Sequence, residues 1–321
     1  MNRKNPLLPT IAVAATCLAA GLAVAAGAHM ATGRLVNEGV YLKNYRPLFW
    51  EESLLSHKMD YALRSHEDND TLFLGDSTCL MDLDPARFTQ ETKRTAYNLG
   101  TIGWLESDGH LQILRDYLRS HPKPKLLVYL IFPVDLTADF KTNEAFKDRF
   151  VWAYGPEMRA ERGLERWPLE DRRREEFRTL VGLILRRRTR YFEREVVPGL
   201  THPRLGELLA ETRGFFANRA SLPVAPFAGD LRVTPLAAAR LEALLRFADE
   251  QGIRTIVRLA PMPGPVSDAR KRELEDGLSR LRIERPLVLE FPPSDFGDPW
   301  HLNASGVRRL TDLVARERIH E

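Results

Sequence analysis

The hydrophobic residues of this chain fall into short apolar runs that are separated by longer amphipathic stretches. Five runs are rich in Val, Ile, Leu, Phe or Tyr, at 71–75, 95–100, 125–132, 254–260 and 286–291. This composition is typical of strands that are buried on both faces. Helical periodicity fills the intervals, at 106–121, 234–252, 268–282 and 303–318. The alternation predicts an α/β fold, with a parallel sheet of about five strands and helices on both faces.

The alternation stops at about 136–233, which we interpret as a mostly helical insertion. It contains an apolar stripe flanked by arginines, made of Phe177, Leu180, Val181, Ile184 and Leu185. Three interpretations stay open. The stripe packs on the core, it lies on an anionic membrane surface, or the segment forms a lid over a ligand site.

An uncharged run from Pro6 to Ala28 follows Arg3 and Lys4 near the N-terminus. It reaches the roughly 20 residues that cross a bilayer, and a positive region before an apolar core is typical of a signal peptide or signal anchor. The length favours an uncleaved transmembrane anchor at 1–33, in the inner membrane, with the remainder in the periplasm or another extracytoplasmic space. Secretion after cleavage and a buried helix in a soluble protein are the alternatives.

The anchor divides the chain into three parts. A juxtamembrane connector at 34–69 is expected to join it to a folded domain at 70–321, which holds the insertion. The 321 residues are 44% hydrophobic and 28% charged, as in ordinary globular proteins. A net charge of +3 with interleaved acids and bases gives no indication of nucleic acid as a partner. The two cysteines, Cys17 and Cys79, are not expected to pair, and the scattered histidines predict no metal site.

Two polar motifs follow predicted strands and carry candidate chemistry. Gly-Asp-Ser places Ser77 just after the first strand, and Asp-Pro-Trp-His, from Asp298 to His301, follows the last one. Because the carboxyl ends of parallel strands share one edge, Ser77 and His301 are expected to meet there. A serine hydroxyl needs a base to act as a nucleophile. His301 would be that base and Asp298 would orient its ring, with Asp295 as the rival acid.

A third motif, Asn-Leu-Gly, follows the second predicted strand. The Gly100 N–H, together with the Ser77 N–H, is a candidate donor to the oxyanion of a tetrahedral intermediate. Each motif also has a plain structural interpretation. Gly-Asp-Ser is common in turns, with Asp76 bonding its own turn, glycine suits any tight turn, and Cys79 is then a small buried filler.

Together, "FLGDST", "NLG" and "DPWH" resemble the motifs of the SGNH/GDSL hydrolase superfamily. More narrowly, the chain is similar to membrane-anchored members that are associated with O-acylation of cell-envelope polymers and exopolysaccharides. The similarity covers about 70–135 and 234–317. It implies a three-layer α/β/α sandwich of the flavodoxin-like SGNH type, with Ser77, Asp298 and His301 as the triad and Ser77 and Gly100 as oxyanion donors.

One departure from the family lies after the third strand. The family usually has Gly-x-Asn-Asp there, and its Asn side chain is a second oxyanion donor, whereas this chain reads "YLIFPVD" at 129–135. Asn98 would substitute for the missing side chain or cap a turn. Asp135 would bind a sugar hydroxyl or cap the end of the strand.

The sequence therefore predicts a membrane-tethered, envelope-facing serine acyltransferase or esterase that acts on acyl groups of a cell-envelope or exported polysaccharide. The resemblance implies no cofactor. It favours a carbohydrate polymer as the substrate and a polytopic membrane acyltransferase as the partner that supplies the acyl group. The alternative is a catalytically impaired SGNH-fold module that binds glycan or scaffolds a polysaccharide secretion complex.

Overall fold

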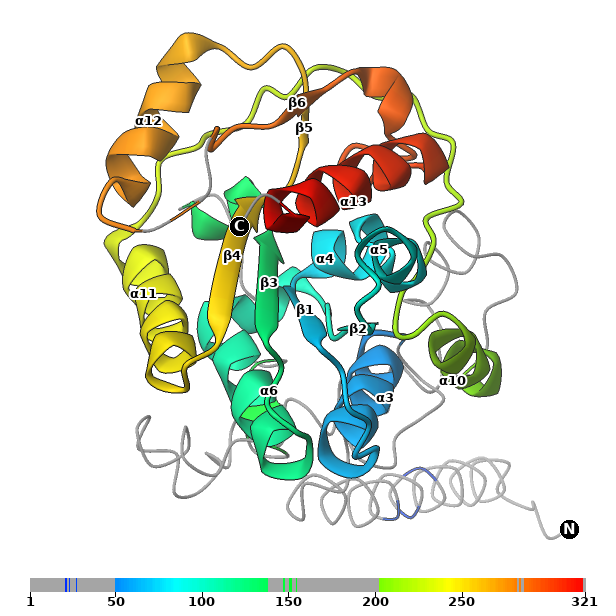
Figure 1. Ribbon diagram of the computed structural model, residues 1–321. Coiled ribbons are helices and arrows are strands. Elements are labelled where there is room, and N and C mark those ends of the chain that lie inside the picture. The colour runs from blue at the N-terminus through cyan, green and yellow to red at the C-terminus, as the bar shows by residue number, and fades with distance from the viewer. Residues whose placement is uncertain are drawn as a thin grey trace, which may run out of the picture.

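The computed structural model describes residues 50–137, 202–281, 283 and 286–319, with isolated positions at 21, 23, 27, 147, 150, 151 and 154. Its central sheet has four parallel strands in the order β2-β1-β3-β4 (Figure 1). The strands are β1 (Thr71–Gly75), β2 (Ala96–Asn98), β3 (Leu126–Ile131) and β4 (Arg254–Leu259). Thr71 faces Ala96 on one side and Leu126 on the other, and Leu126 faces Arg254. The predicted α/β class with a parallel sheet is confirmed.

The two central strands are buried along their whole length, as their uninterrupted apolar runs predict. The fifth predicted strand, 286–291, is wrong for the main sheet. Only β6 (Glu290–Phe291) forms, and it pairs with β5 (Met262–Pro263) in a separate two-stranded sheet. Pro286 at the start of this run and Pro292 directly after it have no N–H to donate to a longer ladder.

The described residues form eight α-helices: α3 (Trp50–Arg64), α4 (Ser77–Asp82), α5 (Pro85–Thr92), α6 (Glu106–Ser120), α10 (His202–Glu211), α11 (Pro235–Glu250), α12 (Asp268–Leu278) and α13 (Ala304–Ile319). From β1 the chain passes through α4 and α5 to β2, and then returns through α6 across β1 to β3. Right-handed connections in opposite directions lie on opposite faces of a sheet. Accordingly, α6 contacts α3 and α11, whereas α5 contacts α13 (Figure 1).

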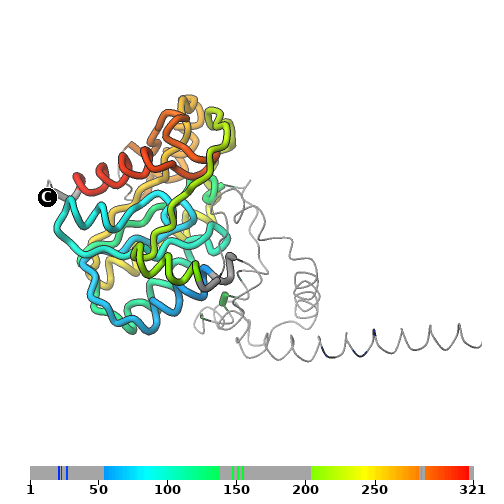
Figure 2. Tube along the Cα trace, turned by 90° about the vertical axis from the view of Figure 1, so that its right-hand side faces the viewer, coloured from blue at the N-terminus to red at the C-terminus, as the bar shows by residue number. Residues whose placement is uncertain are grey.

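The predicted insertion leaves and re-enters the domain at one place, because Thr137 and Val233 form an antiparallel bridge. Its arginine-flanked stripe lies outside the described residues. From α10 onward the chain is described again, and the extended segment 212–234 passes over the carboxyl ends of the strands toward α11 (Figures 1 and 2). This segment therefore borders the edge of the sheet at which the site was expected.

The predicted anchor at 1–33 lies outside the described residues, apart from Gly21, Ala23 and Gly27, which are helical. No helix in the described part of the chain is long and apolar enough to cross a membrane. The predicted connector, 34–69, is described from residue 50, where it forms α3. Leu54, Leu55, Met59 and Ala62 of this helix are buried in the core.

Candidate active site

The turn after β1 sets the position of Ser77, the first residue of α4. Gly75 has a φ of +152°, and a Cβ there would overlap the carbonyl oxygen of Leu130, so the turn requires glycine. Asp76 accepts hydrogen bonds on Oδ1 from the Thr78 N–H (2.8 Å) and hydroxyl (2.6 Å), and on Oδ2 from the Phe132 N–H (2.6 Å). Asp76 therefore bonds its own turn, as expected, and also joins the ends of β1 and β3.

Ser77 and His301 lie side by side although they are 224 positions apart in the chain. Nε2 of His301 is 3.0 Å from Oγ of Ser77. Nδ1 of the same ring lies 3.1 Å and 3.0 Å from the two carboxylate oxygens of Asp298. When Nδ1 carries the proton and donates to Asp298, Nε2 is an acceptor that faces the serine hydroxyl. The structure thus brings the three predicted triad residues together at the carboxyl edge of the sheet.

Backbone hydrogen bonds fix the turn that carries His301. Oδ1 of Asp298 accepts from the N–H of Trp300 (2.8 Å) and from that of His301 (2.9 Å). Asp82, at the end of α4, accepts from the Leu302 N–H at 2.9 Å. The following Asn303 caps α13, because its Oδ1 accepts from the second and third N–H groups after it, at 2.9 and 3.2 Å. The imidazole is consequently held at both ends of its turn.

The electrostatics of the pair suit proton transfer. Burial lowers the pKa of His301, but the hydrogen bond to Asp298 and its negative charge outweigh burial, so the pKa lies above its ordinary value. Burial raises the pKa of Asp298, but the hydrogen bond and charge of His301 outweigh it and hold that pKa below the usual range. Asp298 is therefore ionised at neutral pH and stabilises the imidazolium that forms when His301 accepts a proton.

Asn218 is a contact of the triad that the sequence did not reveal. Its Nδ2 donates to Oδ2 of Asp298 at 3.1 Å and to the carbonyl oxygen of His301 at 3.4 Å, and its Oδ1 accepts from the Ala220 N–H at 3.0 Å. The side chain comes from the segment that passes over the strand ends. No local signal could have found it, since nothing around Asn218 in the sequence indicates where that segment runs.

The rival acid, Asp295, has another partner. It lies in the short 3-10 helix η4 (Pro293–Asp295), and its Oδ2 pairs with the Arg309 guanidinium at 3.2 Å. The acid that contacts the His301 ring is therefore Asp298.

The predicted oxyanion and substrate contacts around β2 are used within the protein. The Gly100 N–H donates to Oδ1 of Asn98 at 2.7 Å, and Asn98 is fully buried. Nδ2 of Asn98 donates to the carbonyl oxygens of Cys79 (2.7 Å) and Leu83 (2.9 Å). In this arrangement Asn98 joins β2 to the α4 region and is not exposed to a substrate, and the Gly100 amide is not available to one either. Cys79 is a buried thiol whose pKa is raised well above its ordinary value by burial, in keeping with a filler.

Asp135 occupies the place where the family has its Asn. It lies in the 3-10 helix η2 (Pro133–Leu136) after β3. Burial, followed by the charge of Asp76 and a hydrogen bond to it, raises the pKa of Asp135 well above its ordinary value. The carboxyl group of Asp135 is thus bonded to Asp76 and does not face solvent as a free acid. Gly103 packs against its carboxyl group and leaves no room for a Cβ.

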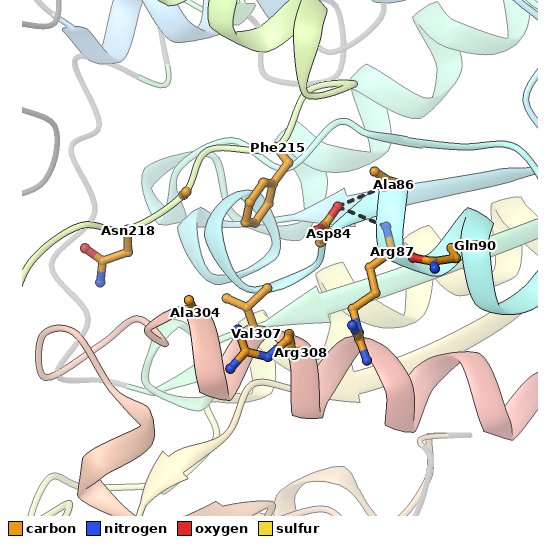
Figure 3. A pocket seen from close by; sticks show the side chains of 10 residues that line it. Asp84, Ala86, Arg87, Gln90, Phe215, Asn218, Ala304, Val307 and Arg308 are labelled. Atoms are coloured by element: carbon orange, nitrogen blue, oxygen red, sulfur yellow. Dashed lines mark hydrogen bonds between the residues drawn. The ribbon is translucent and has the colours of Figure 1, made fainter.

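A pocket of about 410 Å³ lies between α5, α13 and the 215–218 segment (Figure 3). Phe215 and Val307 supply apolar lining, and Arg87 and Arg308 supply charge. Asn218 also lines it, whereas Ser77 and His301 do not. Asn218 thus both lines this pocket and donates to Asp298. As for metals, no group of three or more His, Cys, Asp or Glu side chains in the described ranges is arranged to hold an ion.

Comparison of the chain with protein-family models and with curated proteins found no match. Membership of the SGNH/GDSL superfamily therefore stays a prediction that rests on the motifs, and the function is argued from the geometry of the site.

Proposed function

We propose that this protein is an SGNH-type serine acyltransferase or ester hydrolase that acts through Ser77, His301 and Asp298. The observation that carries the proposal is the line of contacts from Asp298 through the two ring nitrogens of His301 to the serine hydroxyl. A base within reach and an acid that fixes its tautomer are what a serine nucleophile needs. The finer fold, a three-layer flavodoxin-like SGNH sandwich, belongs to the same proposal and is supported by the strand order and by helices on both faces.

In the proposed reaction, Oγ of Ser77 attacks the carbonyl carbon of an acyl ester while Nε2 of His301 takes the hydroxyl proton. The bond between this carbon and the leaving alcohol oxygen breaks, and His301 gives its proton to that oxygen. An acyl-serine remains. A carbohydrate hydroxyl or water then attacks the acyl carbon and gives its proton to His301, which returns it to the departing Ser77 oxygen. A carbohydrate acceptor makes the protein a transferase and water makes it an esterase.

The tetrahedral intermediate also needs hydrogen-bond donors for its oxygen. The Ser77 N–H serves in the proposal, because it is the first amide of α4 and has no acceptor among the residues that the structure describes. The Gly100 amide is already bonded to Asn98. An oxyanion site that lacks one donor loses about 3 kcal/mol of transition-state stabilisation, so turnover slower than that of a complete site is expected.

The missing oxyanion donor favours a second candidate, the catalytically impaired module that binds glycan or scaffolds a secretion complex. An intact triad with an incomplete oxyanion site would then be a remnant of an enzyme. We place the enzyme first because a buried Asp298–His301 pair aimed at a hydroxyl is maintained by contacts from α4, from the turn itself and from Asn218.

The proposal keeps the envelope-facing, membrane-tethered placement predicted from residues 1–33, with a carbohydrate polymer as substrate and a polytopic acyltransferase as the source of acyl groups. Its support is the apolar run after Arg3 and Lys4 in the sequence. A tether would keep Ser77 near polymers that are made at or exported through the membrane.

Turnover of p-nitrophenyl acetate, with and without added oligosaccharides, tests the proposal. We expect p-nitrophenol release by the wild type, acetylated oligosaccharide or free acetate as the second product, and no release above background with Ser77→Ala. Ser279→Ala, on an exposed serine whose hydroxyl bonds the Asp276 carbonyl, is the matched control and should behave as wild type. Equal rates for folded wild type and Ser77→Ala would refute the enzyme and leave the binding module.

A further inference from the structure

Two large apolar side chains are exposed in the described part of the protein, Leu236 at 60% and Trp300 at 48%. Leu236 lies near the start of α11. Trp300 lies within that turn, between Asp298 and His301. Scattered exposed apolar residues are ordinary on protein surfaces, but a half-exposed tryptophan adjacent to a candidate base invites a functional explanation, since tryptophan is usually buried to a large extent.

The indole is rigidly mounted. The backbone N–H of Trp300 donates to Oδ1 of Asp298, which fixes the main chain, and the indole ring packs edge-to-face against Phe132, with centroids 5.6 Å apart and planes at 87°. Phe132 is in turn packed against Phe227, at 6.2 Å and 80°. Pro299 before it has a fixed φ, which further limits the turn. A ring held in this way binds a flat ligand without losing much conformational freedom.

These contacts also place the Trp300 ring near Ser77. Phe132 directly follows β3, and its N–H donates to Asp76, the neighbour of Ser77 in the turn after β1. On the other side, His301 follows Trp300 in the chain and contacts the Ser77 hydroxyl. Trp300 consequently borders the carboxyl edge of β1 and β3, where a substrate of Ser77 would bind.

The surroundings of the ring select a ligand class. A fatty acyl chain would need a continuous apolar groove, whereas Trp300 is the single exposed large apolar side chain in the described residues of this turn and its neighbours. The face of an indole is electron-rich and attracts polarised C–H groups. A pyranose ring has a C–H face of this kind, and its hydroxyls lie around its rim, where they can stay hydrated beside a half-exposed indole.

We propose that Trp300 is the stacking platform for a pyranose ring of the glycan that is presented to Ser77. The inference rests on the proposed function for the identity of the site and names its substrate class. It makes Trp300 a binding residue whose loss weakens glycan binding more than it affects a small ester that has no sugar.

Binding is measured first, in a Ser77→Ala background that cannot turn substrates over. Xylo-, manno- and gluco-hexaose, each with and without O-acetyl groups, are titrated by calorimetry. We expect at least one to bind, with Kd at least ten-fold higher after Trp300→Ala, an intermediate Kd after Trp300→Phe, and no change after Leu236→Ala, the matched exposed apolar control. An unchanged Kd in Trp300→Ala, or no binding to any of the six, overturns the platform.

Turnover separates this inference from the proposed function. With Ser77 intact, Trp300→Ala should lower kcat/KM for the acetylated hexaoses at least ten-fold more than for p-nitrophenyl acetate. Equal losses on both, or a greater loss on p-nitrophenyl octanoate than on the acetate, overturn the sugar platform and, in the second case, assign the ring to an acyl chain. If the wild type binds glycan through Trp300 but shows no Ser77-dependent turnover, the enzyme proposal fails and the platform stands.

Discussion

Replacing Asp298 by asparagine is the most informative single change in the triad, because five contacts converge on this carboxylate. Its oxygens accept from Nδ1 of His301, from the backbone N–H groups of Trp300 and His301, and from Nδ2 of Asn218. An amide has one acceptor and one donor in place of two acceptors. If its NH₂ group takes the Oδ2 position it faces the Asn218 NH₂, and if it takes the Oδ1 position it faces two backbone N–H groups.

Both orientations leave buried donors unpaired, at a cost of about 1–3 kcal/mol of stability. An amide NH₂ next to Nδ1 also stabilises the tautomer that carries its proton on Nε2, which then no longer accepts from Ser77. In a serine triad the equivalent change lowers kcat by about 10⁴-fold through the wrong tautomer. We therefore expect Asp298→Asn to remain folded and to lose about three to four orders of magnitude in Ser77 acylation.

The pH dependence of acylation gives a second readout. Acylation needs a neutral imidazole, so the rate of the wild type rises with pH through the raised pKa of His301. In Asp298→Asn the burial that lowers this pKa persists while the charge that raises it is gone, so the midpoint moves to lower pH. Asp295→Asn, whose acid pairs with Arg309, is the control and should leave rate and midpoint unchanged. An Asp298→Asn profile that matches wild type in plateau and midpoint would refute the assigned role.

Two further changes follow from the same contacts. Asn218→Ala removes a hydrogen bond to an ionised carboxylate, worth about 1.5–3 kcal/mol; we expect Ser77 acylation to slow by about ten-fold or more, and an unchanged rate constant would show that Asn218 does not orient Asp298. Burial lowers the pKa of Lys58 to about 7, where its Nζ donates to two backbone carbonyls. The unfolded chain then binds more protons above pH 7, so the free energy of unfolding should rise with pH from about 7 toward 10.5. Lys58→Met should flatten this slope in urea denaturation, and parallel slopes would contradict the buried position.

Much of the sheet could be predicted because its signal is local. Apolar runs with no polar interruption mark β1 and β3, and helical spacing marks α6 between β2 and β3. The run at 286–291 is also apolar, but it pairs with β5, which follows β4, over only two residues. Pro286 at its start and Pro292 after it have no N–H for a longer ladder. Which strand pairs with which depends on the path of the whole chain, so it cannot be inferred from the hydrophobic residues of one segment.

The candidate site divides in the same way. The rule about parallel strands places Ser77 correctly at the carboxyl edge of the main sheet. It does not account for His301, because the strand before it pairs only with β5, outside that sheet; the structure nevertheless has the two side chains 3.0 Å apart. The direction of individual groups does not follow from such a rule. Asn98 and Gly100 do lie at the end of β2 as predicted, but the Asn98 side chain is buried and its Oδ1 accepts the hydrogen bond of the Gly100 N–H. Asn218 reaches Asp298 only because of the path of the 212–234 segment.

Covalent labelling with a fluorophosphonate, read by intact mass and peptide mapping, tests the triad most directly. The proposed geometry predicts one adduct per chain, located on Ser77, that forms more slowly in His301→Ala and not at all in Ser77→Ala. Folded wild-type protein that takes up no label, or takes it up at another serine, would contradict the claim that His301 activates this hydroxyl.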